Sequence, residues 1–207
     1  ILAGFMAFKA ASVSQEAALR RDHQTAVEYD YMPYELPFYT HNREWLAINW
    51  AMIGEYQKAT DLMKRNLAVP RHYEFNNVKN DYSMAQTGYI NLLQIYEFAG
   101  LWEEGLEFLS QEKYKKDLTQ GHLEALWLAY QAKVALHTGD RLKFAGLIAP
   151  FMSEVGRYEN DPKNKSNVIM ELIREQMFEI QAYYQAMLLP DQKEALYKEL
   201  TNQVSLE

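Results

Sequence analysis

The segment Gly54-Glu-Tyr56-Gln-Lys-Ala59 decides how this chain folds, because its pattern occurs three times. A glycine is followed two positions later by an aromatic residue, and a small or apolar residue stands three positions after that. The other copies are Gly100-Leu-Trp102-Glu-Glu-Gly105 and Gly139-Asp-Arg141-Leu-Lys-Phe144, in which arginine replaces the aromatic residue. Each copy lies between two segments of helical periodicity, which indicates a helix, a tight turn and a second helix. One such hairpin cannot bury its apolar face alone, so the repeats predict stacked hairpins.

The periodicity of apolar residues extends this pattern over the whole chain. We expect one all-α domain spanning residues 1–207, built as an α-solenoid of antiparallel helix hairpins. Residues 1–28 form one helix of a partial first hairpin, and residues 29–40 form a connector. The predicted hairpins span residues 41–67, 81–113, 119–155 and 166–203.

The connector is rich in aromatic residues. Pro33 and Pro37 interrupt the helical pattern, and five aromatic residues lie between positions 29 and 39. Free solvation of so many rings is unfavourable, so we expect the connector to pack against the fold. The simpler interpretation is a link that covers the apolar end of the array. The alternative is a lid or docking strap over the solenoid groove.

Composition excludes several classes of protein. The chain is 48% hydrophobic and 24% charged, which is typical of a globular protein. Its net charge of −7 argues against nucleic acid as a partner. There is no cysteine, which excludes disulfides and thiolate chemistry. The apolar run of residues 1–8 is too short to span a bilayer, for which about 20 residues are needed. We expect a soluble protein, and composition leaves cytoplasm and periplasm equally open.

Two of the three repeats resemble the tetratricopeptide repeat (TPR). The first carries Leu46, Ala47, Trp50, Gly54, Tyr56 and Ala59, and the second carries Tyr89, Leu92, Tyr96, Gly100, Trp102, Gly105 and Leu109. The stretch Tyr39-Thr-His-Asn42 with the residues after it is also similar to a group of uncharacterised bacterial TPR-like proteins. The resemblance implies that the α-solenoid is a right-handed superhelix, and that it is a scaffold that binds a protein or a peptide segment, without catalysis.

A binding face follows if the array curves as TPR stacks do. The first helix of each hairpin would then line the inner face, and its side chains would contact the peptide. The residues predicted there are His41, Glu44, Gln94, Glu97, Lys133 and His137. No residue is predicted to act in catalysis, to bind a cofactor or to hold a metal ion.

Two other functions stay open. His41 and Glu44 lie on one helix face and would suit an acid–base or metal pair, so an enzyme or small-ligand receptor could use them with His137 around a pocket. No third ligand stands nearby, and Glu44 at a helix N-terminus also has a purely structural explanation. Glu171, Glu175 and Glu179 are interpreted as a solvated stripe, because no Glu-x-x-His pair accompanies them. The other function is structural, with apolar surface driving self-association into a homo-oligomer.

Overall fold

The structure of the protein is a computed structural model that describes residues 2–36, 38–160 and 168–188. Within these ranges the chain forms nine α-helices, one 3-10 helix and no β-strand. This confirms the all-α class. The chain divides into two compact units, Ile1–Leu123 and Glu124–Glu207. None of the helices in the described ranges is long and apolar enough to cross a membrane.

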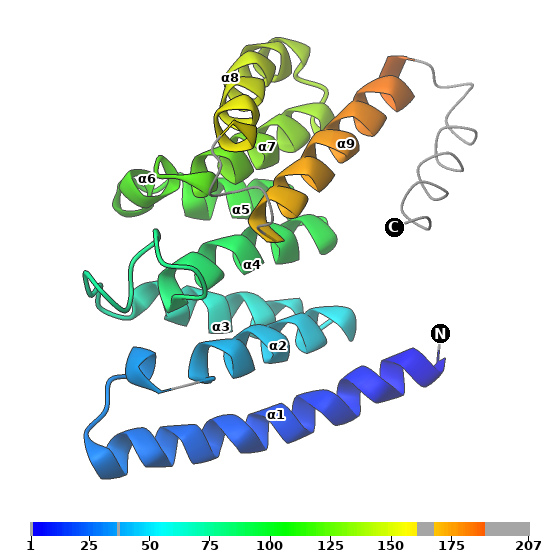
Figure 1. The fold of residues 1–207 in the computed structure, drawn as a ribbon. Coiled ribbons are helices and arrows are strands. Elements are labelled where there is room, and N and C mark those ends of the chain that lie inside the picture. Colours follow the sequence, from blue (N-terminus) through cyan, green and yellow to red (C-terminus); the bar gives the residue numbers. More distant parts are fainter. Residues whose placement is uncertain (1, 37, 161–167, 189–207) are drawn as a thin grey trace. The chain divides into compact units, whose positions relative to one another are not determined.

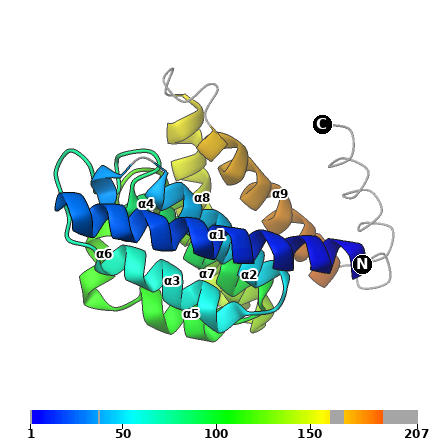
Figure 2. The same ribbon diagram turned by 90° about the horizontal axis from the view of Figure 1, so that it is seen from below.

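The first unit contains α1 to α6 (Figure 1). The bounds are α1 (Leu2–Tyr29), the 3-10 helix η1 (Pro33–Glu35), α2 (Tyr39–Met52), α3 (Tyr56–Ala68), α4 (Met84–Phe98), α5 (Trp102–Leu109) and α6 (Glu112–Leu118). Each of α1 to α4 packs against the next helix in the chain, so that the last of these contacts joins α4 to α5. Helix α2 also contacts α4. Figure 2 shows α1 lying in front of α2, its packing partner, in the view from below. The first unit is therefore built from helices that stack in chain order.

The repeated glycines end helices as the sequence predicts. Gly54, Gly100 and Gly139 have φ angles of 84°, 68° and 74°, in the left-handed region that glycine adopts without a steric cost. At the first of these turns, the Gly54 N–H donates to the Ala51 carbonyl at 3.0 Å and the next N–H donates to the Trp50 carbonyl at 2.8 Å. These bonds satisfy carbonyl groups that the end of α2 would otherwise leave open. The chain can then reverse into α3 within a few residues.

The second hairpin differs from its predicted form. Its second helix was expected to run without a break to residue 113, but α5 ends at Leu109 and α6 begins at Glu112. Gln111 adopts an extended conformation between them, with φ −61° and ψ 141°. The break turns the buried Tyr114 towards Phe108 and Tyr89, whose ring centroids lie 4.9 and 6.0 Å from the Tyr114 ring. Aromatic packing thus replaces the last turns of the expected helix.

A half-buried arginine ties the first hairpin together. In α2, Arg43 donates through Nη2 to the carbonyl of Leu62 in α3 at 3.1 Å, and through Nε to the side chain of Asn66. Its guanidinium also lies over the Tyr39 ring, 5.5 Å from the ring centroid. Burial lowers the pKa of the Arg43 guanidinium, because desolvation disfavours the charged form. The contacts of this cation are neutral acceptors and a ring, and they span both helices of the hairpin.

Helices α3 and α4 approach closely at Gly88. A β-carbon built on Gly88 would lie 2.8 Å from Leu67 Cδ2 and 3.2 Å from Asn66 Cβ. Both neighbours are buried, so they have little room to move away. Glycine is therefore required here for packing, although it lowers the helix propensity of α4.

Gly88→Ala should destabilise the protein by about 1–3 kcal/mol, because overpacking at α3 outweighs the gain of about 1 kcal/mol in helix propensity. Gly146→Ala is the matched control, since no atom lies within 4 Å of the β-carbon it would add in α8. The control should be stabilised by about 0.5–1 kcal/mol. Thermal and urea denaturation followed by circular dichroism measure both. If Gly88→Ala were stabilised as much as Gly146→Ala, the close approach of α3 and α4 at Gly88 would be wrong.

The second unit contains the rest of α7 (His122–His137), α8 (Arg141–Glu159) and α9 (Val168–Leu188). Phe144 of α8 stacks on Tyr184 of α9 with 5.3 Å between ring centroids. Arg157 of α8 lies 3.8 Å from Glu124 of α7. Helix α9 corresponds to the first helix of the predicted hairpin 166–203, and the second helix of that hairpin lies outside the described residues.

A buried histidine gives the first unit a dependence on pH. His122 is 9% exposed, and burial lowers its pKa, an effect that the charge of Asp81 partly opposes. Above the unfolded pKa of about 6.5, His122 is neutral in both states and contributes nothing. Below it, the unfolded chain binds the proton more readily, so the free energy of unfolding falls with falling pH until the lower folded pKa is passed.

His122→Gln should therefore make stability less sensitive to pH below about 6.5. Urea denaturation of the variant and of the parent chain at a series of pH values measures this difference. His23→Gln, at an exposed position of α1, is the control for replacing a histidine that is not buried. If the free energy of unfolding of His122→Gln still fell as steeply below about pH 6.5 as that of the parent chain, the role of burial at His122 would be wrong.

Candidate functional site: an aromatic cluster on the first unit

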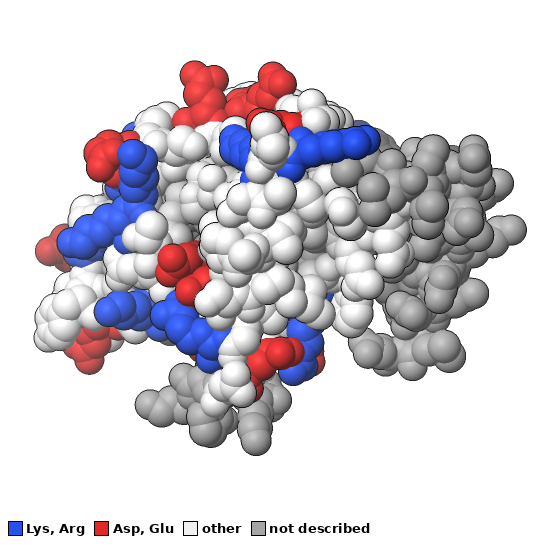
Figure 3. Space-filling model, turned by 90° about the horizontal axis from the view of Figure 1, so that it is seen from above, with Lys and Arg blue, Asp and Glu red and all other residues white. Residues whose placement is uncertain are grey.

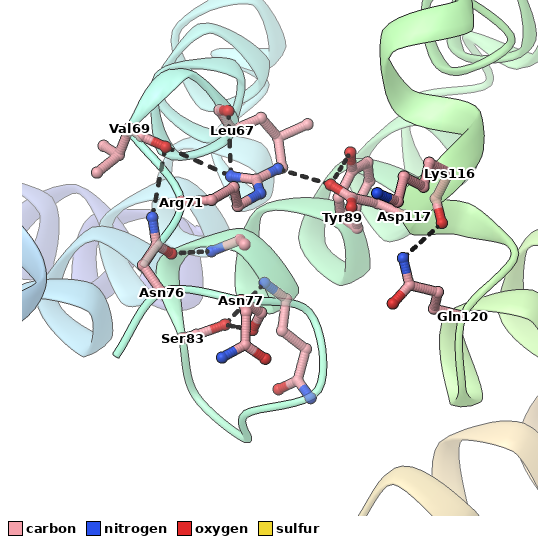
Figure 4. A network of polar contacts seen from close by, with 12 residues as sticks. Leu67, Val69, Arg71, Asn76, Asn77, Ser83, Tyr89, Lys116, Asp117 and Gln120 are labelled. Atoms are coloured by element: carbon pink, nitrogen blue, oxygen red, sulfur yellow. Dashed lines mark hydrogen bonds and ion pairs between the residues drawn. The ribbon is translucent and has the colours of Figure 1, made fainter. Parts of the chain in front are cut away.

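The loop between α3 and α4 (residues 69–83, the α3–α4 loop) is held in place by a buried asparagine. Asn76 has no exposed surface. Its Oδ1 accepts from the Ala85 N–H at 2.9 Å, and its Nδ2 donates to the Pro70 carbonyl at 2.8 Å. Figure 4 shows the longer bond of 3.4 Å from the same Nδ2 to the Val69 carbonyl. Ala85 lies in the first turn of α4, where backbone N–H groups lack helical partners. One side chain therefore caps α4 and fixes the start of the loop.

Other polar side chains of the loop also bond within it. Asn77 Nδ2 donates to the Tyr73 carbonyl at 2.7 Å, and Asn77 Oδ1 accepts from the Lys79 N–H at 2.9 Å. Asn80 Nδ2 donates to the Glu74 carbonyl. Ser83 Oγ accepts from the Gln86 N–H at 3.1 Å as the N-cap of α4, and donates to the Asn77 carbonyl (Figure 4). The loop is thus held together by hydrogen bonds between its own side chains and backbone, and it is anchored on α4.

The loop is also anchored on α6. Arg71 Nη2 donates to Asp117 Oδ2 at 2.8 Å, and the hydroxyl of the buried Tyr89 donates to the same oxygen at 3.0 Å (Figure 4). Arg71 Nη1 also donates to the carbonyl of Leu67, at 3.3 Å, near the end of α3. Burial raises the pKa of the Tyr89 phenol, and the charge of Asp117 acts in the same direction. The hydroxyl accordingly remains a hydrogen-bond donor to Asp117.

This framework presents a group of aromatic rings to solvent. We call it the aromatic cluster, and it consists of Tyr34 from η1 and of His72, Tyr73 and Phe75 from the α3–α4 loop. The His72 ring lies 5.6 Å from Tyr34, 4.8 Å from Tyr73 and 4.9 Å from Phe75, measured between ring centroids. Tyr73 is 86% exposed and Phe75 is 47% exposed. Such a concentration of exposed rings is typical of an interaction surface.

The backbone of the loop fixes the orientation of His72. Its Nδ1 accepts from the N–H groups of Glu74 and Phe75 at 3.3 and 3.2 Å. His72 and Asn76 also exchange backbone hydrogen bonds as an isolated antiparallel bridge. The ring at the centre of the cluster therefore cannot turn without breaking loop bonds.

The connector contributes to the same end of the unit, but most of it is not buried. Tyr34 packs on the loop, as the packed-link interpretation requires. In contrast, Tyr29, Tyr31 and Phe38 are 60%, 50% and 74% exposed, so burial does not explain these rings. Phe38 also has a positive φ of 67°, and so does Tyr82 of the loop at 63°. Bulky residues rarely adopt this conformation, so the backbone costs free energy at both positions.

The residues predicted to line a peptide groove are placed as follows in the first unit. His41 Nδ1 lies 3.9 Å from Glu44 Oε2 on α2, and Glu44 Oε1 accepts from Asn91 Nδ2 of α4 at 3.3 Å. Gln94 lies one turn beyond Asn91 on α4 and is exposed, and Glu97 one turn further is half-buried. The first helices of two hairpins are therefore adjacent here, so four of the six predicted residues lie on neighbouring helices.

The other two predicted residues, Lys133 and His137, belong to the second unit. His137 is exposed at the end of α7. The Lys133 side chain is 1% exposed, and its ammonium lies 2.8 Å from Glu179 Oε2 and donates to the side-chain oxygen of Gln176. Helix α9 thus covers Lys133, which differs from the solvated position expected for it. Glu179 likewise differs from the purely solvated stripe expected of it, whereas Glu171 and Glu175 are exposed.

The described part of the chain has no metal-binding group, and the face drawn in Figure 3 is not strongly basic. Its histidine, aspartate and glutamate side chains form no group of three that could hold a metal ion. On the face drawn in Figure 3, acidic and basic side chains are interspersed among the residues shown. The aromatic cluster is therefore the most distinctive surface feature of the described residues.

Comparison of the sequence with models of protein families, with curated proteins and with solved structures finds no match. The resemblance to TPR proteins thus depends on the repeat residues alone.

The sequence contained a signal for the cluster, although residues 69–80 read as a polar loop. Three aromatic side chains, His72, Tyr73 and Phe75, stand among asparagines that favour turns. What the sequence does not reveal is that Tyr34, more than 30 residues earlier, joins them.

Proposed function

We propose that the protein is a non-enzymatic module that binds a segment of another protein. The proposed architecture behind this function is a TPR-like array of hairpins, supported by the stacking of α1 to α4 and by the glycine turns. The observation that carries the proposal is the aromatic cluster. Its exposed rings are held by a loop whose asparagine side chains form hydrogen bonds to backbone groups of the loop and of α4. A rigid set of exposed rings offers contact area at a low cost in conformational entropy.

Two surfaces of the first unit are candidates for peptide contact. One is the aromatic cluster, and the other is the helix face carrying His41, Glu44, Gln94 and Glu97. The cluster is favoured because aromatic side chains supply most hot spots of interfaces, whereas Gln94 and Glu97 are polar residues on a helix surface.

A peptide-display selection on the full-length chain tests the proposal. Peptides selected on the parent protein should lose affinity by about tenfold or more on a Tyr73→Ala/Phe75→Ala variant, as expected when hot-spot rings are removed. A Gln94→Ala/Glu97→Ala variant tests the helix face in parallel. Circular dichroism verifies that each variant remains folded. Failure to select any peptide, or selected peptides that bind both variants as tightly as the parent, would overturn the proposed function.

A further inference from the structure

The aromatic cluster belongs to two chain segments that are rich in acidic residues. The two segments that build this end of the unit, residues 28–38 and 72–82, contain five carboxylates and one basic residue. All six of these side chains belong to exposed residues, namely Glu28, Asp30, Glu35, Glu74, Asp81 and Lys79. With five carboxylates and one lysine, these two segments carry a net charge of −4, against −7 for the whole chain.

The five carboxylates have no cationic partner within the described part of the chain. Ion pairs there involve other acidic residues, such as Asp117 with Arg71 and Glu104 with Lys64. Glu35 accepts from the Met32 N–H and Asp81 accepts from the Gln86 side chain, and both bonds leave the negative charge in place. The potential over the cluster is consequently negative and attracts cations.

The rings themselves also favour a cation. The face of an aromatic ring carries a partial negative charge, so a cation above it is attracted. The chain already uses this interaction elsewhere, with Lys64 over Phe108 at 4.8 Å and Lys113 over Tyr114 at 4.6 Å. On the aromatic cluster, by contrast, no cation of the described residues is seated on Tyr73 or Phe75. Glu74 stands between these two residues in the sequence and is exposed.

We propose that the aromatic cluster binds an extended basic peptide segment, with an arginine guanidinium against the Tyr73 and Phe75 rings and its charge matched by Glu74 and the neighbouring carboxylates. Arginine suits this surface better than lysine, because the planar guanidinium stacks on rings and bonds to a carboxylate through two N–H groups. This assignment rests on the proposed function and adds the chemistry of the partner.

The test is a charge series on one peptide framework. A labelled Gly/Ser/Pro peptide carries arginine at alternate positions, and three further versions carry lysine, glutamine or glutamate there. Fluorescence anisotropy with the full-length protein should give the order arginine, lysine, glutamine, with no binding of the glutamate peptide. Raising the salt concentration from about 50 to about 300 mM should weaken the arginine peptide, because exposed charges are screened.

Variants locate the binding. Tyr73→Ala should weaken the arginine peptide by about 3- to 30-fold, the range expected for a cation–π contact. Glu74→Gln should weaken it by about two- to fivefold, as for an exposed ion pair. Glu107→Gln removes an exposed carboxylate of α5 and should have no effect. Because Tyr73 and Glu74 are exposed, these substitutions leave the fold intact, which circular dichroism checks.

The outcomes separate this inference from the proposed function. If the glutamine peptide or an uncharged oligosaccharide binds as tightly as the arginine peptide, with Tyr73→Ala weakening both, the cationic partner is wrong. If it is the glutamine peptide that binds as tightly and that Tyr73→Ala weakens, the proposed function, peptide binding at the aromatic cluster, would still be supported. If none of the four peptides binds, or if Tyr73→Ala has no effect, this inference is overturned. Self-association of the chain that Tyr73→Ala abolishes would assign the surface to a second copy and likewise overturn it.

Discussion

Asn76→Ala is expected to destabilise the first unit by about 2–5 kcal/mol, one of the two largest effects that we predict. The substitution leaves the buried Ala85 N–H without its side-chain partner and removes the bond from Asn76 to the carbonyl of Pro70, which is an exposed residue. An unsatisfied buried group costs about 1–3 kcal/mol, a lost hydrogen bond costs about 1 kcal/mol, and the missing amide adds a small cavity. Urea denaturation of the full-length chain measures the loss.

Two controls make the result specific. Ser83→Ala removes the N-cap of α4 together with the bond to the Asn77 carbonyl, and it should cost about 1 kcal/mol, less than Asn76→Ala. Asn160→Ala removes an exposed amide that bonds to the Gly156 carbonyl, and should be close to neutral. If Asn76→Ala were no more destabilising than these controls, the central role of Asn76 in the loop would be wrong.

The same substitution should release the aromatic cluster. Amide hydrogen exchange of residues 72–82 should accelerate in Asn76→Ala relative to the helices of the first unit, because the loop loses its attachment to α4. Affinity for the arginine peptide should fall along with this order. Retained loop protection would show that the remaining asparagines and Arg71 suffice to hold the rings.

Glu179→Ala is expected to cost about 1–3 kcal/mol, although Glu179 is itself an exposed residue. It removes the carboxylate that lies 2.8 Å from the ammonium of Lys133, whose side chain is 1% exposed. Breaking a fully buried ion pair from one side costs about 3–5 kcal/mol, and the 48% exposure of the Glu179 side chain reduces this. Thermal denaturation, with tryptophan fluorescence as the probe, measures the loss.

Lys133→Met distinguishes charge from packing at the same place. Methionine fills a similar volume and removes the buried charge, so stability should change by about 1 kcal/mol or less in either direction. The double variant Lys133→Met/Glu179→Ala should be more stable than Glu179→Ala alone, because no uncompensated ammonium remains. If Lys133→Met proves as damaging as Glu179→Ala, the lysine contributes through contacts other than this ion pair.

The sequence predicted the parts of the fold that depend on local signals. The glycines at 54, 100 and 139 each adopt the left-handed conformation, and the helices on either side of them lie close to where periodicity put them. The break between α5 and α6 was missed because no glycine or proline marks it, and because its cause is the packing of Tyr114 on distant rings. Local patterns do not carry information of that kind.

The candidate site was harder to predict for the same physical reason. The aromatic cluster joins residues from two segments through ring contacts, and its loop depends on Asn76 reaching across to α4. Lys133 was placed on an open face because nothing within α7 shows that α9 covers it. The pairing of His41 with Glu44 was accessible, since it is set by helical spacing alone.

The position of the α3–α4 loop also bears on how such a protein can diversify. The loop joins two hairpins and is fastened at Asn76 and Ser83, whereas the turns within the hairpins are short and defined by Gly54 and Gly100. Substitution at Tyr73, Glu74 or Phe75 therefore leaves the helix register untouched. A loop grafted between the same two anchors would carry a new specificity on an unchanged scaffold, so this chain offers a ready starting point for engineered binders.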